Sequence, residues 1–210
     1  MPVMSDREYR RINVSDLETR DEQDGGMIVE GYATTFNQPY FLYGNERYKV
    51  YEEVDRNAFD DADMSDVIMQ YDHEGRVFAR VRNNTLELES DEHGLKIRAH
   101  LGGTEIGRQL YEEIKGGYTD KMSFGFTVEK EQITEERDEA NDTTTIHRRI
   151  TKIHKLYDVS AVSLPANDAT EISARCLGEG VIAEAEKERL AIEERRRKAD
   201  QIRLMMEVNR

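Results

Sequence analysis

Residues 85–101, TLELESDEHGLKIRAHL, contain the clearest structural pattern in this chain. Leu86 and Leu88 alternate with charged residues, and Leu95 and Ile97 do the same after the turn-forming sequence DEHG. A repeat of two residues is typical of strands that bury one face, so this stretch predicts a β-hairpin. We therefore expect a mainly β fold built from short strands of this kind.

Further strand-like stretches lie on both sides of this hairpin. They are rich in β-branched and aromatic residues, and turn-forming sequences separate them. They cover residues 27–36, 48–54, 67–73, 77–83, 121–133 and 145–164, and 169–177 closes the sheet-forming part. We predict roughly eight or nine strands with two or three helices (an α+β chain), and short strands at this spacing favour a closed or nearly closed β-barrel flanked by helices.

Two segments predict helices beside the sheet. Residues 104–117, TEIGRQLYEEIKGG, place Ile106, Leu110 and Ile114 four positions apart, and the two glycines at the end stop the helix. Asn57 can cap a short helix in the sequence NAFDDAD, whose acidic residues suit the first turn.

Composition divides the chain into three parts. Residues 1–26 form a polar N-terminal segment, 27–178 carry the strand-like pattern of the predicted domain, and 179–210 are a charged C-terminal helical extension. After Gly180 the extension has strong helix formers and only sparse apolar residues. We predict a solvated helix outside the barrel, with a role in self-association or in binding an assembly partner as the alternative.

The charge balance limits the possible partners. The 210 residues include 44 acidic and 30 basic side chains, for a formal net charge of -14. This acidity argues against a general nucleic-acid-binding protein. The chain also lacks an apolar run of the roughly 20 residues that a membrane span needs, and the first residues lack the apolar region of a secretory signal.

Cys176 is the single cysteine, so no disulfide can form within the chain. This fits a reducing cytoplasm. No histidine lies near Cys176 in the sequence, and we interpret it as an ordinary small residue rather than a reactive thiol.

Three residues suited to nucleophilic catalysis lie in separate strand-like segments. His73, Ser123 and Asp158 each lie at or near the end of an apolar run, where a side chain is held by a strand but stays reachable. A serine hydroxyl needs a base beside it and a third group that orients the base. These residues could fill those roles, although a turn histidine and a strand serine bonded to backbone are the ordinary alternatives.

His154 is an alternative third member, because it shares strand parity with Asp158. Ser160 and Ser163 are nearby rival nucleophiles, which we interpret as strand serines. The five histidines are scattered and no C-x-x-C motif is present, so the sequence gives little support for a metal site. We predict neither a metal nor another cofactor.

Backbone N–H groups near the nucleophile are candidates for an oxyanion hole. They could come from the region of Phe124, or from the turn formed by Pro165, Ala166 and Asn167, which could equally be a simple strand-ending turn. Gly125 marks a position where the backbone approaches another group closely, and a substrate carbonyl is one such group.

From Met27 to Arg175 the chain resembles the prohead (procapsid maturation) proteases of tailed bacteriophages. The resemblance rests on the order and spacing of six blocks: GYATTFN, EEVDRNAFDDA, QYDHEGRVFAR, DEHGLKIRAHL, GRQLYEEIKGGYTDKMSFGF and LYDVSAVSLPANDATEISA. The family is related to the herpesvirus assemblins, and the resemblance implies a serine protease with a β-barrel wrapped by helices.

The resemblance also assigns roles to residues. Ser123 matches the nucleophile of the S-x-G-F block, and His73 matches the general base. Asp158 matches the acidic residue before V-S, where many relatives have glutamate and the herpesvirus relatives use a second histidine. Relatives often continue after the histidine toward Leu-Gly-Arg, whereas this chain has EGRVFAR, so the shape of that loop is expected to differ.

The resemblance finally implies a biological setting. Such proteases lie inside the immature capsid in the host cytoplasm, where they cut scaffold protein or the scaffolding segment of the capsid protein, and then themselves. It implies self-association as a homodimer or a larger assembly, and no nucleic-acid or membrane partner. The alternative from another class is an inactive barrel that serves as a scaffold or assembly protein; a metal-dependent hydrolase is third.

Overall fold

The computed structural model describes residues 7–12, 17–21, 26–162 and 168–208 of the chain. Within them the chain forms eleven strands, two α-helices and one 3-10 helix, η1 (Val81–Asn83). The strands are β1 (Glu8–Ile12), β2 (Glu18–Asp21), β3 (Met27–Thr35), β4 (Tyr40–Gly44), β5 (Tyr48–Val54), β6 (Ile68–Tyr71), β7 (Glu74–Arg80), β8 (Leu86–Ser90), β9 (Gly94–His100), β10 (Lys121–Asp138) and β11 (Thr143–Val162). The α-helices are α1 (Glu105–Lys115) and α2 (Asp168–Val208).

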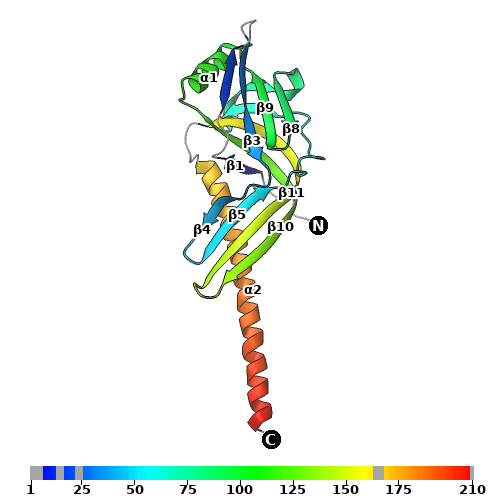
Figure 1. Ribbon diagram of the computed structural model, residues 1–210, viewed down its shortest axis with the longest axis vertical. Helices are drawn as coiled ribbons and strands as arrows, with labels where there is room; N and C mark the ends of the chain where they lie inside the picture. Colours follow the sequence, from blue (N-terminus) through cyan, green and yellow to red (C-terminus); the bar gives the residue numbers. More distant parts are fainter. Residues whose placement is uncertain (1–6, 13–16, 22–25, 163–167, 209–210) are drawn as a thin grey trace.

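The strands form two separate sheets (Figure 1). The larger sheet has the order β1-β10-β11-β5-β4, and β6 and β7 extend it from β11. The smaller sheet has the order β2-β3-β9-β8, and its β8–β9 pair confirms the predicted hairpin. Apolar side chains from both sheets form one core cluster, which includes Ile97 of β9, Phe124 of β10 and Val159 of β11. A core shared between two sheets buries the apolar face of each.

The predicted closed or nearly closed barrel is wrong. No ladder joins the two sheets among the described residues, although one isolated bridge pairs Phe36, directly after β3, with Val54 of β5. β11 pairs with β5 through its first half and with β6 through its second half, so the larger sheet branches. A barrel closes only when a single series of strands returns to its first member, and a branched sheet does not do this.

Helix α1 confirms one of the two helices predicted beside the sheet. The Thr104 side chain accepts a hydrogen bond from the Gly107 N–H and caps the first turn, as capping serines and threonines do. Leu110 and Ile114 are buried, and the helix ends before Gly116.

The helix predicted from Asn57 is wrong, because the segment forms a series of turns. Ala58 N–H bonds to the Asp55 carbonyl, and Asp60 N–H bonds to the Asn57 carbonyl, each spanning three residues rather than four. Asp63 then donates its N–H to the carbonyl of His154. This bond ties the segment to β11, so a helix cannot continue.

The hairpin of β10 and β11 is longer than predicted. The strands predicted at 121–133 and 145–164 continue toward each other as a paired ladder, and only residues 139–142 form the exposed tip. In Figure 1 the far part of this hairpin and the β4–β5 pair extend away from the two-sheet body. This extension gives α2 a surface on which to pack.

Helix α2 begins at Asp168, so the strand predicted at 169–177 is wrong. The residues from Asp168 to Glu171 read D-x-x-E, a capping-box pattern that favours a helix start here. Ile182 and Ala185 pack with Tyr48 and Ile146 in a second core cluster. Beyond this contact α2 continues past the hairpin tip, as Figure 1 shows. Neither described helix is long and apolar enough to span a membrane.

Candidate active site

His73 lies in a tight turn rather than at the end of a longer strand. Tyr71 of β6 pairs with Glu74 of β7, so Asp72 and His73 alone connect the two strands. Both have positive φ, 48° and 61°, as both central residues of a type I′ hairpin turn require. The strand predicted at 67–73 therefore ends two residues early. The turn between it and the strand predicted at 77–83 lies at residues 72–73 rather than 74–76. Left-handed backbone at a non-glycine residue is uncommon, and it often occurs at functional sites.

Ser123 lies inside β10, between two paired strands. Its partners in register are Arg11 of β1 and Ser160 of β11, and the residue is fully buried. Asp158 lies on β11 opposite Gly125 of β10, and it is also buried. The rigid β10–β11 ladder thus fixes the backbone of both residues.

The structure brings His73, Ser123 and Asp158 together. His73 Nδ1 lies 2.5 Å from Asp158 Oδ1, and His73 Nε2 lies 2.5 Å from Ser123 Oγ. Ser160 Oγ also donates to Asp158 Oδ1 at 3.0 Å, which helps to hold the carboxylate. This hydroxyl–imidazole–carboxylate order is the arrangement by which a base is oriented and a serine is activated.

Gly125 makes room for this arrangement. A methyl group at this position would lie 2.3 Å from Asp158 Oδ2 and 2.8 Å from the Tyr9 ring. The predicted close approach is therefore confirmed, and the group that approaches is the carboxylate of the site. Any side chain here would push Asp158 away from His73.

We expect Gly125→Ala to slow a reaction at Ser123 by on the order of 100-fold, because a displacement of about 1 Å in a catalytic constellation has this effect. The rate at which a serine-reactive fluorophosphonate labels Ser123 measures it. Gly103→Ala is the matched control, since a methyl group there meets no atom within 4 Å. Full activity of Gly125→Ala would show that the position of Asp158 does not matter.

The other predicted site residues lie elsewhere. His154 is exposed on β11, and no hydrogen bond or ion pair of the described residues joins it to His73 or Ser123. Phe124 is buried in β10, paired with Arg10 on one side and Val159 on the other. Pro165, Ala166, Asn167 and the rival Ser163 lie outside the described residues, as does the side chain of Cys176. The oxyanion donors thus stay a prediction.

No set of three or more His, Cys, Asp or Glu side chains in the described ranges is placed to hold a metal ion.

Comparison with known proteins identifies the family. Residues 15–181 match the sequence profile of the family described as Caudovirus prohead serine protease. The chain belongs to this family. Among solved structures, the capsid assembly protease gp21 of bacteriophage T4 is similar with a TM-score of 0.41 and 11% identity, over 75% of this chain and 99% of that one. A comparison with curated protein sequences gave no match.

Strand β1, which precedes the residues matched to the prohead serine protease family, covers the site. The Tyr9 ring lies 4.5 Å from the His73 ring, centroid to centroid. The Arg7 guanidinium lies over the Tyr157 ring and 3.9 Å from Asp158 Oδ2. The sequence does not predict β1, because EYRRI has little apolar character and its pairing partner lies more than a hundred residues away.

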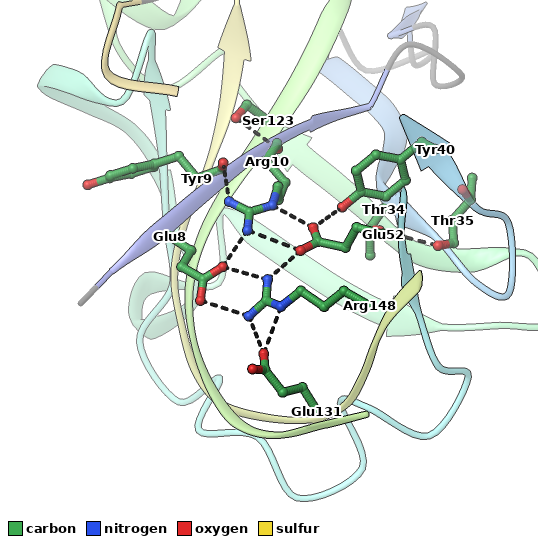
Figure 2. Close-up of polar contacts among 10 residues, drawn as sticks. All are labelled: Glu8, Tyr9, Arg10, Thr34, Thr35, Tyr40, Glu52, Ser123, Glu131 and Arg148. Carbon is green, nitrogen blue, oxygen red and sulfur yellow. Dashed lines mark hydrogen bonds and ion pairs between the residues drawn. The ribbon is translucent and has the colours of Figure 1, made fainter. Parts of the chain in front are cut away.

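A buried charge network lies against the opposite face of β1 (Figure 2). Arg10 Nε donates to Glu52 Oε1 at 2.5 Å, and Arg148 also contacts Glu52. Glu52 and both arginines are almost completely buried. The network consists of Glu8, Arg10, Tyr40, Glu52, Glu131 and Arg148. It ties β1 to β5, β10 and β11.

The network gives Glu52 an acidic pKa. Burial by itself would raise the pKa of Glu52, but the charges of Arg10 and Arg148, with hydrogen bonds from Arg10 and Tyr40, lower it from 4.5 to about 2. A folded-state pKa below the ordinary value stabilises the fold at higher pH. This contribution is complete above about pH 4.5 and is lost as the pH falls toward 2.

We therefore expect the stability difference between the wild-type protein and Glu52→Gln to depend on pH. At pH 7 the variant should be less stable by about 3–5 kcal/mol, because it removes a buried acid that pairs with both Arg10 and Arg148 and leaves Arg10 with only Glu8 among the described acids. The difference should shrink by roughly 3 kcal/mol between pH 5 and pH 2 as the wild-type carboxylate is protonated. Urea unfolding at several pH values measures it; a difference independent of pH would contradict the assignment.

Proposed function

We propose that the chain is a serine endopeptidase in which Ser123 is the nucleophile, His73 the general base and Asp158 the orienting carboxylate. The observation that supports this most is the pair of 2.5 Å contacts that joins Asp158 to His73 and His73 to Ser123. The three residues lie 85 and 50 positions apart in the chain, so their meeting is a product of the fold. Membership in the prohead serine protease family supports the same reaction.

The reaction follows from the hydrogen-bond order. Ser123 Oγ attacks the peptide carbonyl carbon, and His73 Nε2 takes the hydroxyl proton. Asp158 accepts from His73 Nδ1–H and stabilises the imidazolium that forms. His73 then gives the proton to the amine of the leaving peptide, and a water molecule, activated by His73, releases the acyl group from Ser123.

The proposed substrates are the proteins of the immature capsid. The family name refers to the prohead, which is the immature capsid. We propose that this chain cuts scaffold protein or the scaffolding segment of the capsid protein, and also itself, inside the procapsid in the host cytoplasm. The same proposal includes self-association of the chain. It also gives the part of α2 beyond Gly180 one of two roles: a link to scaffold, or a tail that the enzyme removes by self-cleavage.

A fluorophosphonate tests the nucleophile directly, because it reacts with an activated serine and stays attached. We expect mass spectrometry to find the label on Ser123 after incubation for hours. His73→Ala should slow labelling by at least about 100-fold, the scale of general-base catalysis. A protein that never takes up the label, in solution or in assembled particles, would instead be an inactive assembly protein.

A further inference from the structure

We propose that β1 occupies the place of the substrate strand, and that Glu52 selects a basic side chain at the substrate residue whose carbonyl meets Ser123. This inference rests on the proposed function and adds the position, the register and the charge preference of the substrate. The occupant is an extended peptide with arginine or lysine in the place of Arg10. The chain's own N-terminal segment holds that place in the structure.

The first argument is the geometry of the sheet. One edge of β10 is paired with β11, so the edge that β1 covers is the other side on which a peptide can add to the strand of Ser123. Extended peptides commonly bind by adding a strand to such an edge. β1 pairs antiparallel along residues 122–126, directly across the nucleophile.

The second argument is that β1 contacts Ser123 and His73, and that Arg7, directly before β1, lies near Asp158. The Arg10 carbonyl accepts a hydrogen bond of 2.9 Å from Ser123 Oγ (Figure 2). Tyr9 packs on His73, as described above. With β1 in place Ser123 has no exposed surface, and the His73 side chain is only 5% exposed. No substrate peptide reaches the hydroxyl until β1 leaves.

The position of the Arg10 carbonyl offers Ser123 a hydrogen bond that competes with the one to His73. Ser123 has one hydroxyl hydrogen, and two acceptors lie within reach of it, the Arg10 carbonyl and His73 Nε2. Attack on a carbonyl requires that this hydrogen goes to His73. When it is donated to Arg10 the nucleophile is not activated, so β1 keeps the site latent.

The third argument is the side chain of Arg10. Alternate residues of a strand point to opposite faces, so Arg10 points away from the face on which Tyr9 meets His73. Its guanidinium enters the buried network, where it contacts both oxygens of Glu52 (Figure 2). A substrate strand in the same register would place one side chain in this pocket.

The charge of the pocket decides which side chain fits. β1 supplies both Glu8 and Arg10 of the network. Without β1, Arg148 therefore stays between two acids, Glu52 and Glu131, and the pocket keeps one negative charge in excess. Glu52 Oε2 then keeps Arg148, whereas Glu52 Oε1 keeps only the Tyr40 hydroxyl because the Arg10 guanidinium is gone. A buried carboxylate is costly unless a charge is paired with it. A basic side chain restores this pairing, and a neutral or acidic one does not.

The first experiment compares rates of fluorophosphonate labelling at Ser123 in three full-length proteins: wild type, Arg10→Ala and Arg47→Ala. Arg10→Ala removes the anchor of β1, so the fraction of molecules with an open site rises and labelling should accelerate at least about tenfold. Arg47→Ala is the matched control, because Arg47 forms an exposed pair with Asp142 at the hairpin tip. Its rate should equal that of wild type.

Equal rates in wild type and Arg10→Ala would overturn the inference and leave the proposed function standing. Absence of labelling in all three proteins would overturn the proposed function instead. Circular dichroism and thermal unfolding establish that Arg10→Ala keeps the two-sheet body. If that variant does not fold, the peptide experiment that follows decides the question with the wild-type protein alone.

The second experiment uses the acetylated peptide REYRRINV, which repeats residues 7–14. It should slow labelling of Ser123, or be cut, as a competitor of β1. Citrulline has the shape of arginine without its charge. In the place of Arg10 it should lower the affinity of the peptide for the protein by on the order of 100-fold, as expected for a buried charge pair. Citrulline in the place of Arg7 should lower the affinity of the peptide less than about fivefold, because the Arg7 side chain is 41% exposed. Equal weakening by both changes would overturn the role of Glu52.

Discussion

Replacement of Ser123 by alanine should lower the rate of peptide-bond cleavage by on the order of 10⁶-fold, the size of effect seen when a catalytic serine is removed. In the proposed mechanism the hydroxyl oxygen of Ser123 is the attacking atom, and neither His73 nor Asp158 can replace it. Alanine fits the buried strand position, so the fold should survive with a loss of only about 1 kcal/mol from the missing hydrogen bonds. Cleavage of scaffold and of the chain itself, followed on gels and by mass spectrometry, measures the effect.

Ser90→Ala is the control for this experiment, because Ser90 is exposed at the end of β8 in the other sheet. It should process substrate at the wild-type rate. If Ser123→Ala cleaved scaffold as fast as Ser90→Ala, another nucleophile would have to be sought. Ser160 would then be the first candidate, since it is buried beside Asp158.

Asp158→Asn should have the second largest effect, a fall in turnover of on the order of 10⁴-fold. An asparagine amide keeps the size of the side chain but does not select the His73 tautomer whose Nε2 can accept the serine proton. The carboxylate also stabilises the imidazolium, and the neutral amide does not. Stability should change little, because the substitution removes a buried charge whose Oδ2 has no hydrogen-bond partner among the described residues.

His154→Ala tests the competing assignment of the third role. His154 is exposed four residues before Asp158, so its removal should change turnover less than about twofold. Peptide cleavage at several substrate concentrations separates turnover from binding for both variants. Normal turnover in Asp158→Asn together with an inactive His154→Ala would transfer the role to His154.

The competition between these two residues shows where strand parity fails as a guide. Residues 154 and 158 have the same parity, which predicts one face in an ideal strand. The β10–β11 ladder contains register shifts between Gly125 and Val128, opposite this part of β11. β-bulges interrupt the alternation of side chains, and Asp158 is buried while His154 is exposed. Long-range pairing determines where bulges occur.

The helices show a similar division. The α1 pattern is local, since its cap and its apolar face lie within one segment, and the prediction is confirmed. The NAFDDAD segment has equally good local signals, but its bonds to β11 prevent a helix. Tertiary contacts override a short segment's preference because a short isolated helix is only marginally stable.

The mainly β class, the β8–β9 hairpin, helix α1 and the set of candidate residues can all be predicted from the amino-acid sequence. Each of these depends on neighbours within about twenty residues or on residue type. Three features depend on long-range contacts: the sheets stay open, His73 meets Asp158 and Ser123, and β1 lies along β10. The last contact joins residues 113 positions apart. A strand as short and polar as EYRRI has no local pattern that selects its partner. The edge of β10 that β11 leaves unpaired and the buried carboxylate of Glu52 determine where β1 binds.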